Sequence, residues 1–162
     1  MHIGASYLTR ALDRQFIDEA VKDAVENLSR YDFDTIAFLG MSGACFAPLI
    51  AREMHKELIM VRRNFGHDGS GSKRPAEGNA AAKRYIIIDD LVASGQTAGT
   101  IVYGVEDFCA RTFSDAHPEF VGIYQYNYNR FDRPGDTDYE TVRDQALKIR
   151  RLNVGTISNS NG

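Results

Sequence analysis

Residues 85–100 read YIIIDDLVASGQTAGT, and the interpretation of the whole chain starts from this stretch. The run Ile86–Ile88 is a short, β-branched apolar segment of the kind that forms a strand buried on both faces. Two adjacent carboxylates, Asp89 and Asp90, follow at once, and a turn of small residues then leads into a helical pattern. The stretch therefore predicts a strand, an acidic tip, a tight loop and a helix, in that order.

The loop between the acidic tip and the helix has the size and the polar groups that hold a phosphate. Gly95 permits a positive φ angle and a close approach of the backbone to a ligand. Ser94 and Thr97 supply hydroxyls, and the N–H groups that open the next helix favour an anion. Asp89 and Asp90 would repel that anion, so they suit hydroxyl groups or a hydrated Mg²⁺ beside it. A ribose 5-phosphate combines these features, and a buried turn with an N-capping serine is the alternative.

The composition is that of a single soluble domain. The chain has 162 residues, enough for a sizeable core, and a formal net charge of −3, which gives no reason to expect nucleic-acid binding. No apolar run approaches the ~20 residues of a membrane span, and MHIGASYLTR lacks the apolar core of a signal peptide. We therefore expect a cytoplasmic protein without a membrane or nucleic-acid partner. Cys45 and Cys109 fall in apolar helical patterns, which favours buried free thiols over a disulfide or a metal site.

Strands and helices alternate along the rest of the chain. Buried strands are predicted at 35–39 (TIAFL), 58–61 (LIMV) and 120–124 (FVGIY). Helical spacing predicts helices from the N-cap Asp13 onward, over 46–55, over 98–113 and near 139–148, whereas 1–12 reads as a strand or a loop. This order predicts an α/β fold with a central, mainly parallel sheet flanked by helices, in which ligands bind at the carboxyl ends of the strands.

The acidic tip and its loop resemble the signature of the type I phosphoribosyltransferases: a hydrophobic strand, two acids, three variable residues, Ser or Thr, Gly, any residue and Thr. The residues that fill its fixed positions are Asp89, Asp90, Ser94, Gly95 and Thr97. The resemblance covers roughly residues 34–124. It implies that the acidic pair holds the ribose hydroxyls of phosphoribosyl pyrophosphate (PRPP). It also implies that the loop, completed by Ala93 and Gln96, cradles the 5′-phosphate.

The same resemblance assigns the pyrophosphate of PRPP to two further strand ends. A tight turn after the strand 35–39 would bind it through backbone groups; its residues are Met41, Ser42, Gly43 and Ala44. After the strand 58–61, Arg63 takes the second place of a basic pair that is often Arg-Lys, which brings a planar fork in place of a point charge. The alternatives are an ordinary strand-to-helix turn and a solvated strand end.

Residues 64–82 form a long segment that is rich in Gly, Ser and Asn and has no apolar periodicity. Basic residues gather in and around it, although the chain is acidic overall. The resemblance implies a flexible loop that closes over the active site, with Lys73 or Arg74 reaching the departing pyrophosphate. A surface loop without catalytic residues is the alternative.

The segment after residues 120–124 alternates aromatic residues with amides, which suits recognition of a planar heteroaromatic ring. In the family that this chain resembles, a small hood subdomain binds the nucleobase. We therefore expect one phosphoribosyltransferase domain over residues 1–162, with a core of about 13–124 and a hood from 1–12 and 125–162. The nucleobase candidates are Tyr126, Tyr128 and Phe131. An edge strand with ordinary cross-strand aromatic pairs explains the pattern equally well.

The resemblance implies a Mg²⁺-dependent enzyme that transfers the 5-phosphoribosyl group of PRPP to a nucleobase and releases pyrophosphate. Asp89 and Asp90 would meet the metal ion directly or through water. Ala93 stands where enzymes for 6-oxopurines often carry Asp, which favours an adenine- or xanthine-like acceptor and leaves an orotate-type enzyme as the alternative. A non-catalytic protein that senses PRPP or nucleotides is the rival function. A homodimer, common in the family, is left open. A Rossmann-type binder would need a Gly-x-Gly-x-x-Gly turn after the first strand, which the sequence lacks.

Overall fold

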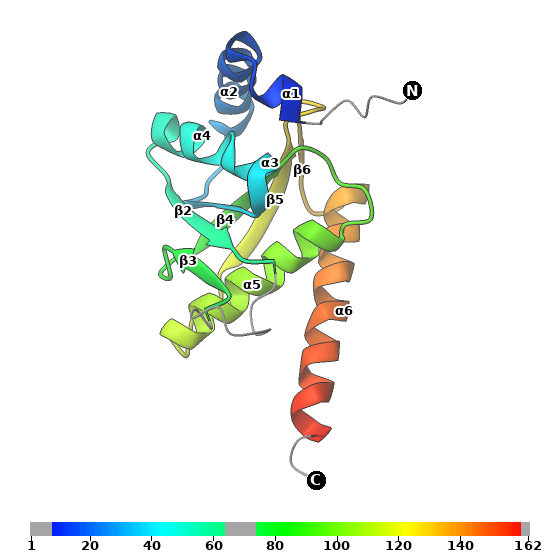
Figure 1. Cartoon of the computed structure of the whole chain (residues 1–162). Coiled ribbons are helices and arrows are strands. Elements are labelled where there is room, and N and C mark those ends of the chain that lie inside the picture. Colours follow the sequence, from blue (N-terminus) through cyan, green and yellow to red (C-terminus); the bar gives the residue numbers. More distant parts are fainter. Residues whose placement is uncertain (1–7, 64–73, 160–162) are drawn as a thin grey trace.

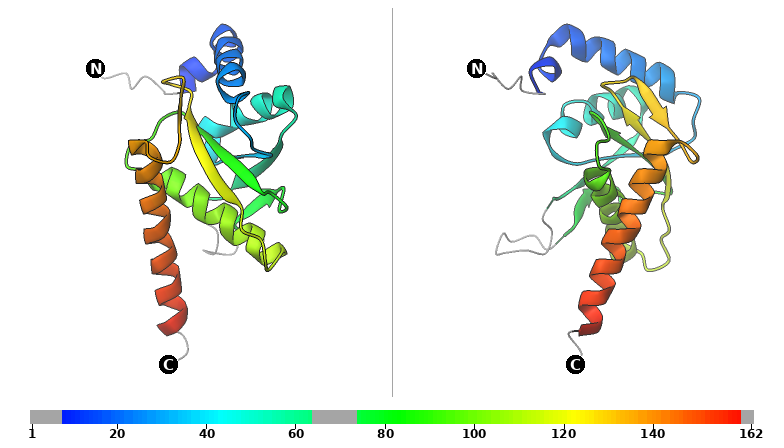
Figure 2. Two further views of the ribbon diagram at one scale, coloured as in Figure 1. Left: turned by 180° about the vertical axis from the view of Figure 1, so that it is seen from behind. Right: turned by 90° about the vertical axis from the view of Figure 1, so that its right-hand side faces the viewer.

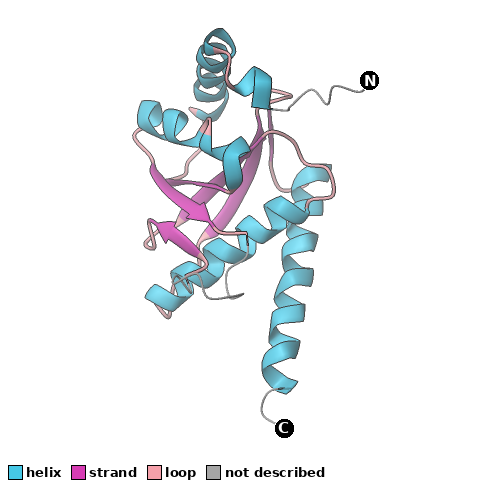
Figure 3. Ribbon diagram, in the orientation of Figure 1, coloured by secondary structure: helices cyan, strands magenta, loops and turns pink. Residues whose placement is uncertain are grey.

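The computed structural model describes residues 8–63 and 74–159, which form a six-stranded sheet with helices on both faces (Figures 1 and 3). The strands are β1 (Thr35–Phe38), β2 (Glu57–Val61), β3 (Ala76–Gly78), β4 (Arg84–Asp89), β5 (Glu119–Gln125) and β6 (Arg130–Asp132). Their order in the sheet is β3-β2-β1-β4-β5-β6; the four central strands run parallel, and β3 and β6 are antiparallel to their neighbours. The predicted α/β fold with a mainly parallel sheet is therefore confirmed.

The helices divide between the two faces of this sheet. They are α1 (Leu8–Ala11), α2 (Arg14–Leu28), α3 (Gly40–Ala44), α4 (Ala47–Met54), α5 (Gln96–Thr112) and α6 (Thr137–Asn159). The first four cover one face, and α5 and α6 cover the other (Figures 1 and 2). Among the described residues, no helix is both long and apolar enough to cross a membrane.

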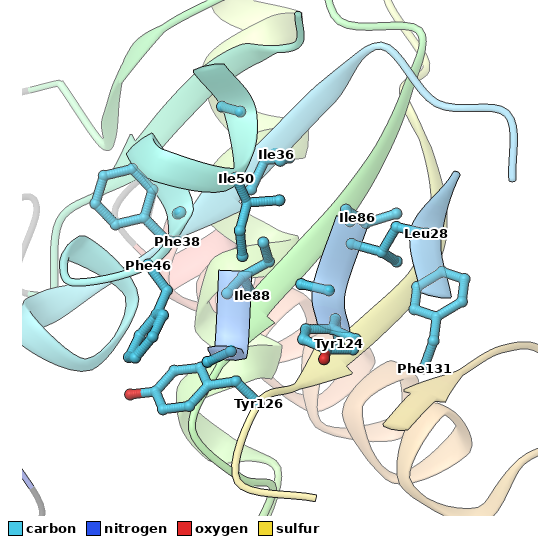
Figure 4. Packing of buried hydrophobic residues seen from close by; sticks show 14 of the residues in the cluster. Leu28, Ile36, Phe38, Phe46, Ile50, Ile86, Ile88, Tyr124, Tyr126 and Phe131 are labelled. Atoms are coloured by element: carbon cyan, nitrogen blue, oxygen red, sulfur yellow. The ribbon is translucent and has the colours of Figure 1, made fainter. Parts of the chain in front are cut away.

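The core consists of two apolar layers, because successive side chains of a strand point to opposite faces of the sheet. Ile86 and Ile88 join the layer under α2 and α4, which also contains Phe46 and Tyr124 (Figure 4). Ile87 joins the layer under α5 and α6. All three isoleucines of β4 are fully buried, as the sequence predicts for a strand covered on both sides. The acidic tip is thus attached to a strand that is buried on both faces.

Local signals set the starts of the two helices that flank the core. The N–H of Phe16 donates to Asp13 Oδ1 (2.9 Å), so α2 begins at the predicted N-cap. Gly95 caps α5 with a φ of 79°, a left-handed conformation that glycine adopts without strain. Cys109 is buried within α5, Cys45 is half-buried, and both thiols are free, as expected.

Three segments differ from their predicted structure. Residues 8–11 form the short helix α1, where a strand or a loop was expected, because four residues carry too little pattern to distinguish these states. The turn after β1 is coiled into α3. Residues 76–78, inside the predicted loop 64–82, form β3, because the returning chain pairs with the open edge of β2.

The C-terminal part of the chain adds one strand to the sheet and one helix to its cover. Residues 130–132 extend the sheet as β6, and α6, which is longer than predicted, packs against α5. The expected division into a core and a hood stays a prediction.

Candidate functional site

The carboxyl ends of β1 and β4 border a cavity of about 260 Å³. It is lined by Ser42 of α3, Arg63 after β2, the acidic pair Asp89 and Asp90, and residues 91–98 of the following loop and helix. The predicted ribose, phosphate and pyrophosphate segments are therefore brought together at one edge of the sheet. A larger groove of about 620 Å³ lies between α2 and α4, and none of the predicted site residues lines it.

Asp89 occupies the end of β4, where its side chain is 5% exposed. Its Oδ1 accepts hydrogen bonds from the Ser42 hydroxyl (2.9 Å) and from the N–H of Asp90 (2.9 Å). Burial, and then the neighbouring Asp90 carboxyl, raise the pKa of Asp89 to about 7. Asp89 is thus a carboxyl that exchanges its proton near neutral pH and that joins β4 to α3.

Asp90 is half-buried and is the more accessible member of the pair. Its Oδ1 accepts from the N–H of Leu91 (2.9 Å), and its carbonyl accepts from the N–H of Asn127 (3.1 Å). These bonds fix the carboxyl at the mouth of the cavity. The two acids therefore differ in character: one is sunk into the sheet, and the other is presented to a ligand.

The loop that follows lies at the N-terminus of α5. Ala93, Ser94 and Gln96 are exposed, and the Ser94 hydroxyl accepts from the N–H of Gln96 (3.3 Å). Thr97 is half-buried in the first turn of α5, a turn that contains no acidic residue. The positive end of the α5 dipole consequently faces the cavity together with backbone N–H groups.

A buried amide, Gln125, holds this loop from behind. Its side-chain oxygen accepts from the N–H of Val92 (2.7 Å), and its side-chain nitrogen donates to Asp138 of α6 (2.8 Å). A polar residue at the end of the apolar strand FVGIYQ is the only signal in the sequence that could have indicated this role. The prediction missed it because both partners are distant in sequence.

Helix α6 also touches the loop directly. A Cβ placed on Gly95 would lie 2.9 Å from Cγ2 of Thr141, and one on Gly99 would lie 2.7 Å from Cβ of Gln145. Only residues without side chains allow this approach, so the loop and the start of α5 rest on α6.

The segment after β1 contributes Ser42 to the cavity. Besides the bond from its hydroxyl to Asp89, its carbonyl accepts from the Tyr126 hydroxyl (3.0 Å). Gly43 lies flat on the sheet, since a Cβ there would be 2.6 Å from Cβ of Phe38. Of the four residues of this turn that are predicted to bind pyrophosphate, only Ser42 lines the cavity; Met41 is exposed, Gly43 is buried and Ala44 is half-buried.

The predicted basic residues separate into two groups. Arg63 is exposed and lines the cavity, whereas Arg62 pairs with Glu77 of β3 (3.0 Å). Arg74 is exposed and does not line the cavity, and Lys73 lies outside the described residues. Among the residues that the structure describes, Arg63 is therefore the cation that lines the cavity.

The three predicted nucleobase residues have different surroundings. Tyr126 and Phe131 are buried in the apolar layer under α2 and α4, while Tyr128 is 57% exposed. The Arg130 guanidinium lies 5.4 Å from the centre of the Tyr128 ring. Tyr128 is thus the most exposed of the three, and contact with a nucleobase stays a prediction.

The acidic pair also decides how Mg²⁺ could be held. Within residues 8–63 and 74–159, no cluster of three His, Cys, Asp or Glu residues could form a protein cage for a metal. Magnesium usually binds through one or two carboxylates together with phosphates of its ligand. Asp89 and Asp90 fit that arrangement, with Asp90 as the better donor because burial favours a protonated Asp89.

Comparison of the sequence with known proteins gives one relevant relative. No family model matches the chain. A protein of Methanocaldococcus jannaschii named transcriptional regulator GfcR is 28% identical in an alignment 101 residues long, which covers 59% of this chain and 47% of that protein. The chain therefore spans about half the length of the curated relative that it matches.

Comparison of the structure gives several similar solved structures. UMP synthase of Leishmania donovani is 29% identical with a TM-score of 0.45, over 67% of this chain and 21% of that one. Orotate phosphoribosyltransferase of Mycobacterium tuberculosis in complex with PRPP is 20% identical with a TM-score of 0.49, over 70% and 61%. Adenine phosphoribosyltransferase of Rhodothermus marinus is 16% identical with a TM-score of 0.48, over 68% and 66%. The solved structures to which this chain is similar thus include phosphoribosyltransferases, the class of enzyme that residues 85–100 resemble.

Proposed function

We propose that this chain binds PRPP with Mg²⁺ and transfers its 5-phosphoribosyl group to a nucleobase. The supporting observation is the cavity at the carboxyl ends of β1 and β4. It joins an acidic pair, the N-terminus of a 17-residue helix and an exposed arginine, which are the groups that a phosphorylated sugar with a diphosphate requires.

The 5′-phosphate belongs in the loop formed by Ala93, Ser94, Gly95, Gln96 and Thr97. The small residues leave room for the anion, and the dipole of α5 stabilises its charge. The ribose then lies beside the acidic pair, and Asp90 accepts hydrogen bonds from its hydroxyls. Asp89 holds Asp90 in place by accepting a hydrogen bond from its backbone N–H. The loop attracts the 5′-phosphate and the two carboxylates repel it, and these two effects together orient the sugar.

The diphosphate belongs beside Ser42 and Arg63. The Arg63 guanidinium can donate two parallel hydrogen bonds to phosphate oxygens, and Arg74 and Lys73 stay candidates for the same task. In the reaction, a ring nitrogen of the acceptor attacks C1 of the ribose while the bond from C1 to pyrophosphate breaks. Bound Mg²⁺ would neutralise charge on the leaving diphosphate. The side chains of this chain act by positioning and by electrostatics.

Pyrophosphate release from PRPP and Mg²⁺ tests this function, with adenine, guanine, hypoxanthine, xanthine, uracil and orotate as acceptors. We expect release that depends on one base or a few, and loss of PRPP binding in the double variant Asp89→Asn, Asp90→Asn. If PRPP does not bind at all in calorimetry, the assignment is wrong.

The second candidate is a regulatory protein that binds PRPP or a nucleotide without turnover. It is favoured by the similarity to a protein named as a transcriptional regulator, of which this chain spans 47%. Binding of PRPP without pyrophosphate release across the whole panel of bases would decide for this candidate.

A further inference from the structure

Tyr126 is poorly placed to stack on a ligand. It follows β5 directly, and its side chain is 7% exposed. Its ring centre lies 4.1 Å from that of Phe46, and Phe46 in turn meets the edge of Phe16 (Figure 4). Because the Tyr126 ring packs against the apolar layer, little of its surface is left to contact a planar nucleobase.

The polar groups of Tyr126 connect the two strand ends that border the cavity. Its hydroxyl donates to the carbonyl of Ser42 in α3 (3.0 Å). Its backbone N–H donates to the carbonyl of Asp89 at the end of β4 (3.1 Å). The residue therefore bridges the acidic tip and the segment after β1, although 84 residues separate it from Ser42.

Ser42 is consequently held at two points. Its hydroxyl donates to Asp89, and its carbonyl accepts from Tyr126. Because a trans peptide is planar, fixing that carbonyl also fixes the direction of the next N–H, which belongs to Gly43. Gly43 cannot shift inward, since even a Cβ there would lie 2.6 Å from Phe38 and 3.3 Å from the carbonyl of Ile88.

We infer that Tyr126 is a positioning residue, whose hydroxyl holds Ser42 in place at the cavity for the diphosphate of PRPP. Because its effect is exerted on the diphosphate, this role rests on the proposed function. This role predicts a difference between ligands. The Tyr126 hydroxyl should increase the affinity for ligands that carry a diphosphate and should not affect the affinity for ligands that carry only the 5′-phosphate. The loop that receives the 5′-phosphate is held by Gln125 and α6 instead.

Calorimetry of the full chain with two ligands tests this role. PRPP and ribose 5-phosphate are titrated, with Mg²⁺, into the parent protein, Tyr126→Phe and Tyr139→Phe. Tyr139 is the matched control, because it is equally buried and its hydroxyl also donates to a backbone carbonyl, that of Phe120 (2.8 Å), away from the cavity. Melting temperatures verify that each variant is folded.

We expect Tyr126→Phe to weaken PRPP binding about threefold to tenfold, the range for losing one neutral hydrogen bond, and to leave ribose 5-phosphate unchanged. The affinity for inorganic pyrophosphate should fall by the same factor as that for PRPP, and Tyr139→Phe should change the affinity for neither PRPP nor ribose 5-phosphate.

Other outcomes would contradict this role. If Tyr126→Phe weakens binding of PRPP and of ribose 5-phosphate equally, Tyr126 has only a structural role, and if PRPP binding is unchanged, it has no role in binding. If the parent protein binds ribose 5-phosphate and pyrophosphate but Tyr126→Phe changes only the affinity for a nucleobase, the residue is a base contact. Failure of the parent protein to bind PRPP would overturn the proposed function and this role with it.

Discussion

The two loops of the cavity are held from opposite faces of the sheet by neighbouring residues. Gln125 bonds to Val92 and to α6, and so supports the loop after β4 from the α5 face. Tyr126 bonds to Ser42 and lies in the apolar layer under α2 and α4, so it supports the segment after β1 from the other face. Because side chains alternate along a strand, one strand end can position both halves of a ligand.

The two supports differ in strength. Gln125 is fully buried, and Asp138, to which it donates, also pairs with Arg130 (2.6 Å). The support of Ser42 from Tyr126 is one bond between neutral groups. A buried network of polar and charged groups is costly to interrupt, whereas one neutral bond contributes modestly. The loop after β4 should therefore be the more rigid of the two.

The largest effect should come from Gln125→Leu. This variant leaves the N–H of Val92 without its buried partner, which costs about 1–3 kcal/mol, and it takes one donor from Asp138, which keeps its pair with Arg130 and should cost about 1 kcal/mol. We expect a loss of about 2–4 kcal/mol in the free energy of unfolding, measured with urea. If Tyr126→Phe proves equally destabilising, the proposed difference between the two supports does not exist.

A smaller effect is expected from Gly99→Ala, which places a methyl group against Gln145 and the backbone of Ala146. Crowding of this kind costs about 1–3 kcal/mol, and the higher helix propensity of Ala returns up to about 1 kcal/mol. We expect a net destabilisation of about 1–2 kcal/mol and weaker binding of ribose 5-phosphate. Gly104→Ala on the same helix is the control, because its methyl group would meet only the Val61 side chain of β2. If Gly99→Ala and Gly104→Ala weaken ribose 5-phosphate binding equally, the contact between α5 and α6 at Gly99 does not control that binding.

The pH dependence of stability should report the burial of the Asp89 carboxyl. The pKa of Asp89 is raised from 3.8 to about 7 in the folded protein, mainly by burial. Between about pH 4 and 7 the folded state therefore binds more protons than the unfolded state, so this group lowers stability as pH rises, with no further loss above about pH 7. In the Asp89→Asn variant, the free energy of unfolding should therefore fall less over this pH range than in the parent protein. Urea unfolding at pH 5, 6, 7 and 8, with a chelator present, measures this difference. Parallel curves for the two proteins would contradict the shifted pKa.

The smallest effect on stability should come from Arg63→Ala. Arg63 is exposed and lines the cavity without bracing either loop, so its removal should change the free energy of unfolding by no more than about 0.5 kcal/mol. PRPP binding should nevertheless weaken, because the diphosphate loses a cation. Arg62→Ala is the comparison, since it breaks a pair with Glu77 instead. An Arg63→Ala variant that binds PRPP like the parent protein would exclude Arg63 from the diphosphate site.

The sequence carries much of the fold in short local patterns. The isoleucines of β4, the acidic pair and Gly95 all lie within one stretch, so the strand, its tip and the start of α5 could be predicted there. Strand β3 could not, because three residues have no periodicity and their structure depends on pairing with β2. The roles of Gln125 and Tyr126 escaped prediction for the same reason. Their partners are set by the folded chain, and an amide or an aromatic residue at a strand end has many other uses.

Helix α6 has a mechanical consequence. It touches the loop after β4 at Thr141 and then continues to Asn159, past the body of the sheet (Figure 2). At 1.5 Å per residue, the 18 residues between these two points span about 27 Å. Arg150 pairs with Glu106 of α5, and the nine residues beyond it make an arm of about 14 Å, whose far end a tilt of about 5° would move by about 1 Å. The distal end of α6 is therefore where a spectroscopic label can register events in the loop without disturbing the groups that bind there.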